Sequence, residues 1–123
     1  MKQYKRLNHF KLQKMLKIKI DEKYNKAIRD KIPEIIAESG KKCNIKHLED
    51  ESFLAELEKK LVEEVNEYAK SKDVEELADL LEVIYRISEL RGINSNELDE
   101  IRQDKAEKRG KFASNLFLID AEK

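Results

Sequence analysis

Residues 60–83 read KLVEEVNEYAKSKDVEELADLLEV, and this stretch decides the fold. Apolar residues recur in it every three or four positions, which is the spacing of one face of an α-helix. A short polar break at residues 71–73 divides the stretch, so it predicts two amphipathic helices that run antiparallel as a hairpin. The apolar residues that carry the pattern are Leu61, Val65, Tyr68, Val74, Leu77 and Leu81.

Capping signals predict two further helices around the hairpin and set the ends of the three long helices. Each long helix is expected to begin after a short polar side chain that accepts backbone hydrogen bonds, and two of them to end at a glycine. Glutamates three residues after the second and third caps add capping boxes. These signals are Asp50 and Ser71 for the first helix, Asp73 with Glu76 and Gly92 for the second, and Asn94 with Glu97 and Gly110 for the third.

A shorter helix is expected before the hairpin. Asp30 is its predicted N-cap, Pro33 fits only its first turn, and Gly40 follows its end. Two short apolar runs, CNIKHL (43–48) and NLFLI (115–119), are predicted to pair as a small two-strand ribbon.

The composition favours an all-α protein of one domain. The 123-residue chain has three glycines, one proline and no tryptophan, which leaves few breaks and few strand-like runs. Charged residues make up 42%, but 26 basic and 26 acidic side chains cancel to a formal net charge of zero. This balance argues against nucleic acid and against an anionic membrane as partners.

The compartment and the domain boundary follow from simple features. The single Cys43 cannot form an intrachain disulfide, and no apolar run reaches the roughly 18 residues that a membrane span needs. No signal-peptide core is found either, so a cytoplasmic location is expected. Residues 1–23 are expected to form a basic extension, which is either mobile or loosely docked, or else a basic arm for a phosphate-bearing ligand or partner. Residues 24–123 are expected to form the domain.

Some carboxylates of the hairpin fall on its apolar side. With residues placed 100° apart around each helix, Glu64 lies inside the apolar arc of its helix and Glu76 inside that of the next. Glu67 and Asp79 lie at the edges of the same arcs. At 1.5 Å per residue, the first pair lies about 6–10 Å from the turn and the second about 5–9 Å, so all four are expected to meet at one level.

Four converging carboxylates repel one another, and burial makes each of them costly. Either some are protonated or a hard divalent cation neutralises them. Mg²⁺, with Mn²⁺ as an alternative, takes oxygen ligands and commonly shares its coordination shell with phosphates. The competing interpretation is that these acids pair with Lys or Arg from a neighbouring helix.

The second helix of the hairpin is apolar over about 240° of its circumference, too wide for one partner helix. A homodimer or a homotetramer is therefore expected.

Cations, rather than leucines, continue the inward face of the last predicted helix. Lys105 and Arg109 lie within about 20° of Leu98, and Lys60 lies one turn before Glu64. Their functional interpretation is phosphate binding beside the metal. The alternative is that they pair with the buried acids or extend to the surface. Arg29 and Lys31 are weaker candidates for the same role, because a surface location explains them equally well.

Taken together, KLVEEVNE (60–67) and EELADLLEV (75–83) resemble the MazG-type, all-α nucleoside triphosphate pyrophosphohydrolases, which are related to phosphoribosyl-ATP pyrophosphohydrolase. YNKAIRDKIPEII (24–36) and KAEKRGKF (105–112) resemble a small, single-domain branch of that group. The resemblance covers about residues 24–118.

The resemblance implies a MazG-like helical bundle completed by oligomerisation. It also implies Mg²⁺-dependent cleavage of a (d)NTP or a related nucleotide between the α and β phosphates, often as a house-cleaning activity. By matching position, the implied metal ligands are Glu64, Glu67, Glu76 and Asp79. The implied catalytic residues are Glu63 and Glu64, and the implied phosphate contacts are Lys60, Lys105 and Arg109. Two alternatives stay open: hydrolysis of phosphoribosyl-ATP, and a non-catalytic helical oligomer that binds a nucleotide or a protein.

Overall fold

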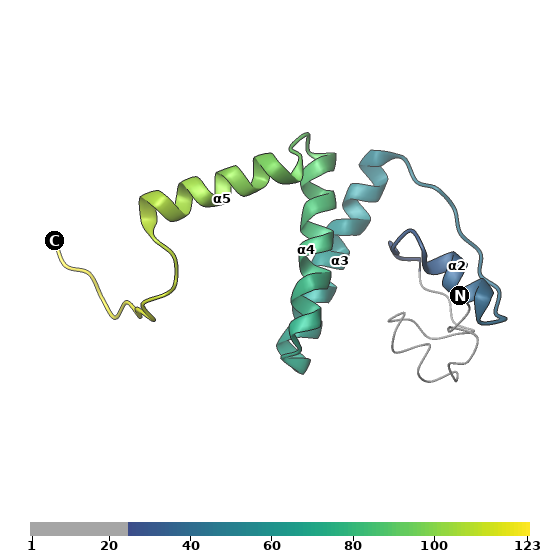
Figure 1. Ribbon diagram of the computed structural model, residues 1–123, viewed down its shortest axis with the longest axis horizontal. Coiled ribbons are helices and arrows are strands. Elements are labelled where there is room, and N and C mark those ends of the chain that lie inside the picture. Colours follow the sequence, from purple (N-terminus) through teal and green to yellow (C-terminus); the bar gives the residue numbers. More distant parts are fainter. Residues whose placement is uncertain (1–24) are drawn as a thin grey trace.

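The computed structural model describes residues 25–123, and this part of the protein is all-helical, as predicted (Figure 1). α3 and α4 pack side by side as an antiparallel hairpin. In Figure 1, α2 is on the side of the hairpin opposite α5. α5 leaves the far end of α4 and extends away on the other side. The helices are α2 (Ile32–Glu38), α3 (Asp50–Ser71), α4 (Val74–Leu90) and α5 (Ser95–Arg109).

The turn between α3 and α4 is tight because only Lys72 and Asp73 connect them. Lys72 takes a left-handed backbone conformation (φ 60°, ψ 18°), which ends α3. The side chain of Asp73 then caps α4 by accepting a 3.1 Å hydrogen bond from the backbone N–H of Glu75. The predicted hairpin is therefore confirmed.

The core of the described chain is small. Ala27, Leu57 and Val83 are buried and pack together, which joins α3, α4 and the segment before α2. Partly buried apolar side chains surround this cluster: Phe53, Leu61, Ile87 and Leu90. At the end of the hairpin remote from the turn, Arg91 and Glu58 form a 2.7 Å ion pair.

Two of the predicted N-caps differ from the structure, and one predicted capping box does not form. The N-cap of α3 is Glu49, without a side-chain hydrogen bond, so Asp50 is the first residue of the helix and not its cap. Lys31, not Asp30, is the N-cap of α2. The capping box between Asp73 and Glu76 does not form, because the N–H of Asp73 donates to the hydroxyl of Ser71 (3.1 Å).

The other capping predictions are confirmed. Asn94 and Glu97 form the capping box of α5, and Gly110 ends that helix. Gly92 follows α4 with φ 89°, and the N–H groups of Gly92 and Ile93 donate to the carbonyls of Glu89 and Ser88. This pattern closes a helix end and needs a residue that tolerates positive φ.

The predicted two-strand ribbon is wrong. Within the described chain no strand is found, and residues 43–48 and 115–119 have irregular backbone. The first run belongs to the connection between α2 and α3, whereas the second follows α5 on the opposite side of the hairpin (Figure 1). Neither run has a strand to pair with, and an unpaired short strand is not stable.

Two further predictions concern the basic extension and membrane spans. The predicted basic extension at 1–23 lies outside the described residues. In the part that the structure describes, no helix is long and apolar enough to cross a membrane.

Candidate metal centre

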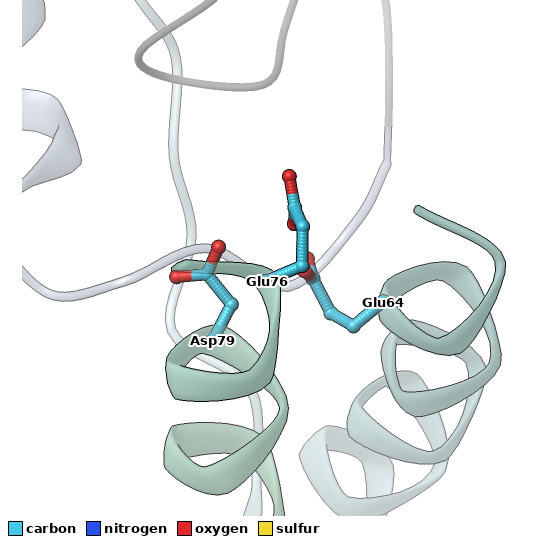
Figure 2. Close-up of side chains that lie close together, drawn as sticks. All are labelled: Glu64, Glu76 and Asp79. Carbon is cyan, nitrogen blue, oxygen red and sulfur yellow. The ribbon is translucent and has the colours of Figure 1, made fainter. Parts of the chain in front are cut away.

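Three carboxylates from the two hairpin helices converge near the turn. Glu64 comes from α3, and Glu76 and Asp79 come from the first two turns of α4. One oxygen of each lies within 4.8 Å of the others. Figure 2 shows Glu64 extending from its helix toward the other two side chains. We call this group the carboxylate cluster.

Burial makes the cluster electrostatically demanding. Glu64 is only 1% exposed and is the largest fully buried side chain among the described residues. Glu76 and Asp79 are half-buried. Carboxylates that share such a site need nearby positive charge, because both desolvation and mutual repulsion oppose their ionised forms.

Lys60 supplies positive charge from within α3. Its ammonium nitrogen lies 3.7 Å from a carboxylate oxygen of Glu64, one helical turn further along. The two side chains are 14% and 2% exposed, so water screens this ion pair only weakly. The structure thus shows the pairing with a buried acid that was the alternative for Lys60, and its role as a phosphate contact stays a prediction.

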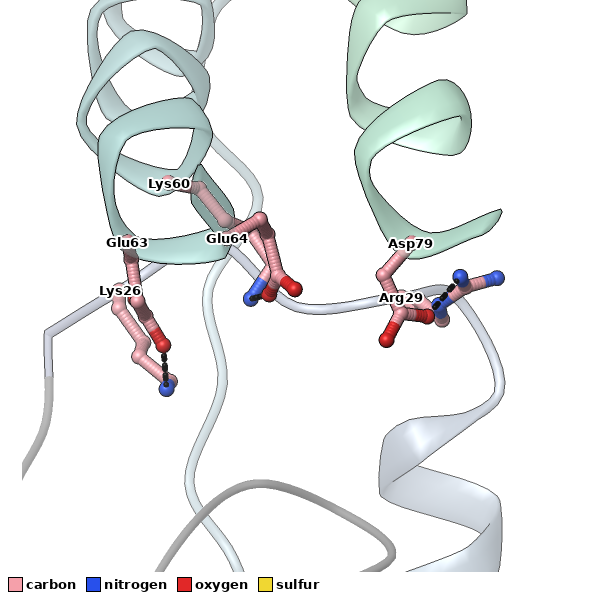
Figure 3. Close-up of polar contacts among 6 residues, drawn as sticks. All are labelled: Lys26, Arg29, Lys60, Glu63, Glu64 and Asp79. Atoms are coloured by element: carbon pink, nitrogen blue, oxygen red, sulfur yellow. Dashed lines mark hydrogen bonds and ion pairs between the residues drawn. The ribbon is translucent and has the colours of Figure 1, made fainter. Parts of the chain in front are cut away.

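The segment before α2 adds two more cations, and each of them contacts a carboxylate on a different helix of the hairpin. Lys26 donates a 2.9 Å hydrogen bond to Glu63 on α3, and Arg29 donates a 2.7 Å hydrogen bond to Asp79 on α4 (Figure 3). Ala27, between them in sequence, is buried in the core. The burial of Ala27 thus anchors the segment where its two cations flank the carboxylate cluster.

The donor set fits a hard divalent cation. It consists of carboxylate oxygens alone, which are the ligands that Mg²⁺ and Mn²⁺ favour, and holds none of the soft ligands typical of Zn²⁺. Mg²⁺ binds oxygen at about 2.0–2.1 Å, so opposite ligands in its octahedron lie about 4.2 Å apart. The carboxylate cluster is already near that spacing, and small side-chain rotations would close the difference.

The cluster contains three of the four predicted metal ligands. Glu67 is half-buried one turn nearer the tip of the hairpin and is not one of the three residues whose oxygens converge. Asp79 lies one turn further from the tip than Glu76, and Glu64 points toward both of them from α3 (Figure 2). The role of Glu67 as a ligand stays a prediction.

Glu63 lies beside the carboxylate cluster on α3 but faces Lys26. Its side chain is 34% exposed, so it keeps access to water while its charge is neutralised. The role of Glu63 as a catalytic residue stays a prediction.

The two α5 cations lie elsewhere in the protomer. Lys105 and Arg109 are exposed on α5, which extends away from the end of α4 opposite the carboxylate cluster (Figure 1). Lys105 lines a shallow depression together with the acidic side chains of Glu97, Glu100 and Asp104. A single chain therefore does not bring these two cations to the cluster, and their phosphate contacts stay a prediction.

Lys26 is the neighbour of the site that the sequence reasoning missed. It lies in irregular backbone next to Asn25, which has a positive φ of 52°, so helical periodicity cannot indicate where its side chain points. The sequence did hold one signal for its position: Lys26 and Arg29 flank the apolar Ala27, and the structure buries Ala27 in the core.

Comparison of the chain with protein-family models, with curated proteins and with solved structures finds no match.

Proposed function

We propose that the protein is a Mg²⁺-dependent nucleotide pyrophosphohydrolase. Its substrate is a (d)NTP or a related nucleotide, and cleavage between the α and β phosphates gives the monophosphate and pyrophosphate. The observation that carries the proposal is the carboxylate cluster flanked by Lys60 and Arg29. Metal ligands and phosphate-binding cations at one place are what the hydrolysis of a phosphoanhydride requires.

Glu64, Glu76 and Asp79 hold the metal in this account, with Mn²⁺ as an alternative to Mg²⁺. A bound Mg²⁺ polarises phosphoryl oxygens and lowers the pKa of a coordinated water. The carboxylates keep their positions on two packed helices, so the ligand geometry is set before the substrate arrives.

The cations orient the phosphates. Arg29 is 51% exposed, so its guanidinium can turn from Asp79 to a phosphate without breaking buried packing. A guanidinium matches two phosphate oxygens, whereas the ammonium of Lys60 acts as a point charge beside Glu64. Together they neutralise the charge that collects on the leaving pyrophosphate.

Glu63 accepts the proton of the attacking water. It adjoins the metal ligand Glu64 and is partly exposed, so water can reach it. Its ion pair with Lys26 holds the side chain in one orientation, which general-base catalysis needs.

The resemblance of residues 60–67 and 75–83 to MazG-type enzymes supports the same chemistry. It also implies a house-cleaning role and a homodimer or a homotetramer. Phosphoribosyl-ATP hydrolysis and a non-catalytic binding role are the alternatives that the experiment must separate.

The experiment compares turnover and metal binding in matched variants. Glu64→Gln and Glu76→Gln keep the side-chain shape but remove a metal-binding charge, so both should abolish pyrophosphate release and weaken Mg²⁺ binding. Glu82→Gln, on an exposed position of α4, should leave both properties unchanged. Phosphoribosyl-ATP belongs in the substrate panel, and its selective hydrolysis would identify that alternative. Full activity in both cluster variants would contradict the proposed site.

A further inference from the structure

The C-terminal end of the described chain exposes an unusual amount of apolar surface. Four consecutive apolar residues stand in this segment, and isolated apolar residues, not contiguous ones, are normal on a protein surface. The large apolar side chains there are between 80% and 99% exposed. We define residues 112–119 as the C-terminal arm, whose exposed apolar residues are Phe112, Leu116, Phe117, Leu118 and Ile119.

The chain's own hairpin does not cover the C-terminal arm. α5 has no buried residues and carries the arm away from α4 (Figure 1). With 15 residues, α5 spans about 22 Å, so the arm begins far from the carboxylate cluster and from the core.

A second exposed apolar surface lies on α4. Its members are spaced by three, four and four residues, which places them along one side of the helix. The residues of this α4 stripe are Val74, Leu77, Leu81 and Tyr85, and they are between 39% and 74% exposed. Val83, on another side of α4, is in the core with Leu57 of α3, so the stripe is an additional apolar surface.

We propose that the C-terminal arm of one copy docks on the α4 stripe of a second copy, and that the exchange is reciprocal. A two-fold arrangement makes both contacts identical. Pairing of stripe with stripe would leave both arms exposed, whereas pairing of arm with stripe covers both surfaces at once. The inference concerns assembly and does not rest on the proposed activity.

The area is sufficient for a stable dimer. A buried phenylalanine covers roughly 150–250 Å², so Phe112 and Phe117 of two arms contribute about 600–1,000 Å². The stripes lose a similar area, which brings the total to about 1,200–2,000 Å², the usual size of a specific interface.

Sedimentation equilibrium of the full-length chain tests the exchange, with Phe117→Ser as the arm variant and Leu81→Lys as the stripe variant. We expect the wild type to dimerise, and each variant to raise the dissociation constant at least about tenfold, as loss of a central interface residue does. Ile45→Lys is the matched control, because Ile45 is 53% exposed but belongs to neither surface. Far-UV circular dichroism checks the fold of each variant, and Tyr85→Lys replaces Leu81→Lys if the latter loses helix.

Mixing the two variants gives the decisive result. The stripe variant retains an intact arm and the arm variant retains an intact stripe, so a mixed dimer regains one of the two contacts. Tighter association in the mixture than in either variant alone is expected. A monomeric wild type, an arm variant that associates as the wild type does, or a mixture without recovery would each overturn the proposal.

Discussion

Arg29 donates a 2.7 Å hydrogen bond to the carboxylate of Asp79, a residue that lies 50 positions later in the sequence. The contact fixes the segment before α2 on α4, and it places a guanidinium directly on one of three converging carboxylates. In the proposed mechanism Asp79 would be one of the residues that hold the metal, and the guanidinium of Arg29 would then bind a phosphate of the substrate.

Arg29→Ala should therefore weaken substrate binding more than stability. Hydrogen bonds to charged groups contribute about 1.5–3 kcal/mol, so KM for a nucleotide substrate is expected to rise about tenfold or more. The free energy of unfolding should fall by less than about 1 kcal/mol, because the side chain is 51% exposed.

Steady-state kinetics and urea unfolding measure both effects. Arg86→Ala is the control, since Arg86 pairs with Glu89 at 3.3 Å and is similarly exposed but lies outside the site. An unchanged KM in Arg29→Ala would remove Arg29 from the phosphate contacts.

Mg²⁺ should stabilise the folded protein. A ligand that binds only the native state adds about 2.7 kcal/mol at a concentration one hundred times its Kd. Thermal unfolding at fixed protein concentration, with and without Mg²⁺, measures the shift in Tm, and excess EDTA should reverse it. An equal shift in wild type and in the Glu64→Gln, Glu76→Gln double variant would place the metal elsewhere.

Lys60→Ala should destabilise the protein more without metal than with it. Lys60 offsets the charge of the buried Glu64 at 3.7 Å, so its loss is expected to cost about 1–3 kcal/mol in the metal-free protein. Saturating Mg²⁺ supplies positive charge at the same place, and the cost should shrink.

Urea unfolding of Lys60→Ala in both conditions gives this difference. Lys59→Ala is the matched control, because Lys59 is 75% exposed and pairs with Glu56 on the surface. A cost that does not depend on Mg²⁺ would mean that Lys60 and the metal do not act on the same carboxylate.

Leu57→Ala should destabilise the hairpin strongly. Leu57 is 5% exposed and contacts the other core residues, and replacement of a buried leucine by alanine costs about 2–5 kcal/mol. Ile45→Ala, at a site that is 53% exposed, should change the free energy of unfolding much less. Urea unfolding at one protein concentration compares them, and similar losses would contradict the described core.

Helical periodicity predicted most of the candidate site. Glu64, Glu76 and Asp79 lie on regular helices joined by a two-residue turn, so angle and rise along each helix were enough to place them together. Two roles were predicted for Glu76, in a capping box and in the cluster, and the structure places it in the carboxylate cluster without the capping box.

Long-range contacts from irregular backbone were beyond this reasoning. Lys26 reaches Glu63 across 37 positions, and its direction depends on how Ala27 packs in the core. The position of α5 likewise depends on the connection after α4. Lys105 was inferred to point inward because it continues the apolar face of its helix. In the single chain α5 extends away from the hairpin, and Lys105 is exposed (Figure 1).

The most direct test of the central claim is the identity of the products formed from a panel of canonical and modified (d)NTPs with and without Mg²⁺. The proposed function predicts Mg²⁺-dependent formation of one nucleoside monophosphate and one pyrophosphate, which phosphorus NMR distinguishes from a diphosphate and inorganic phosphate. Cleavage between the β and γ phosphates, or no cleavage of any (d)NTP by folded protein that binds Mg²⁺, would contradict it.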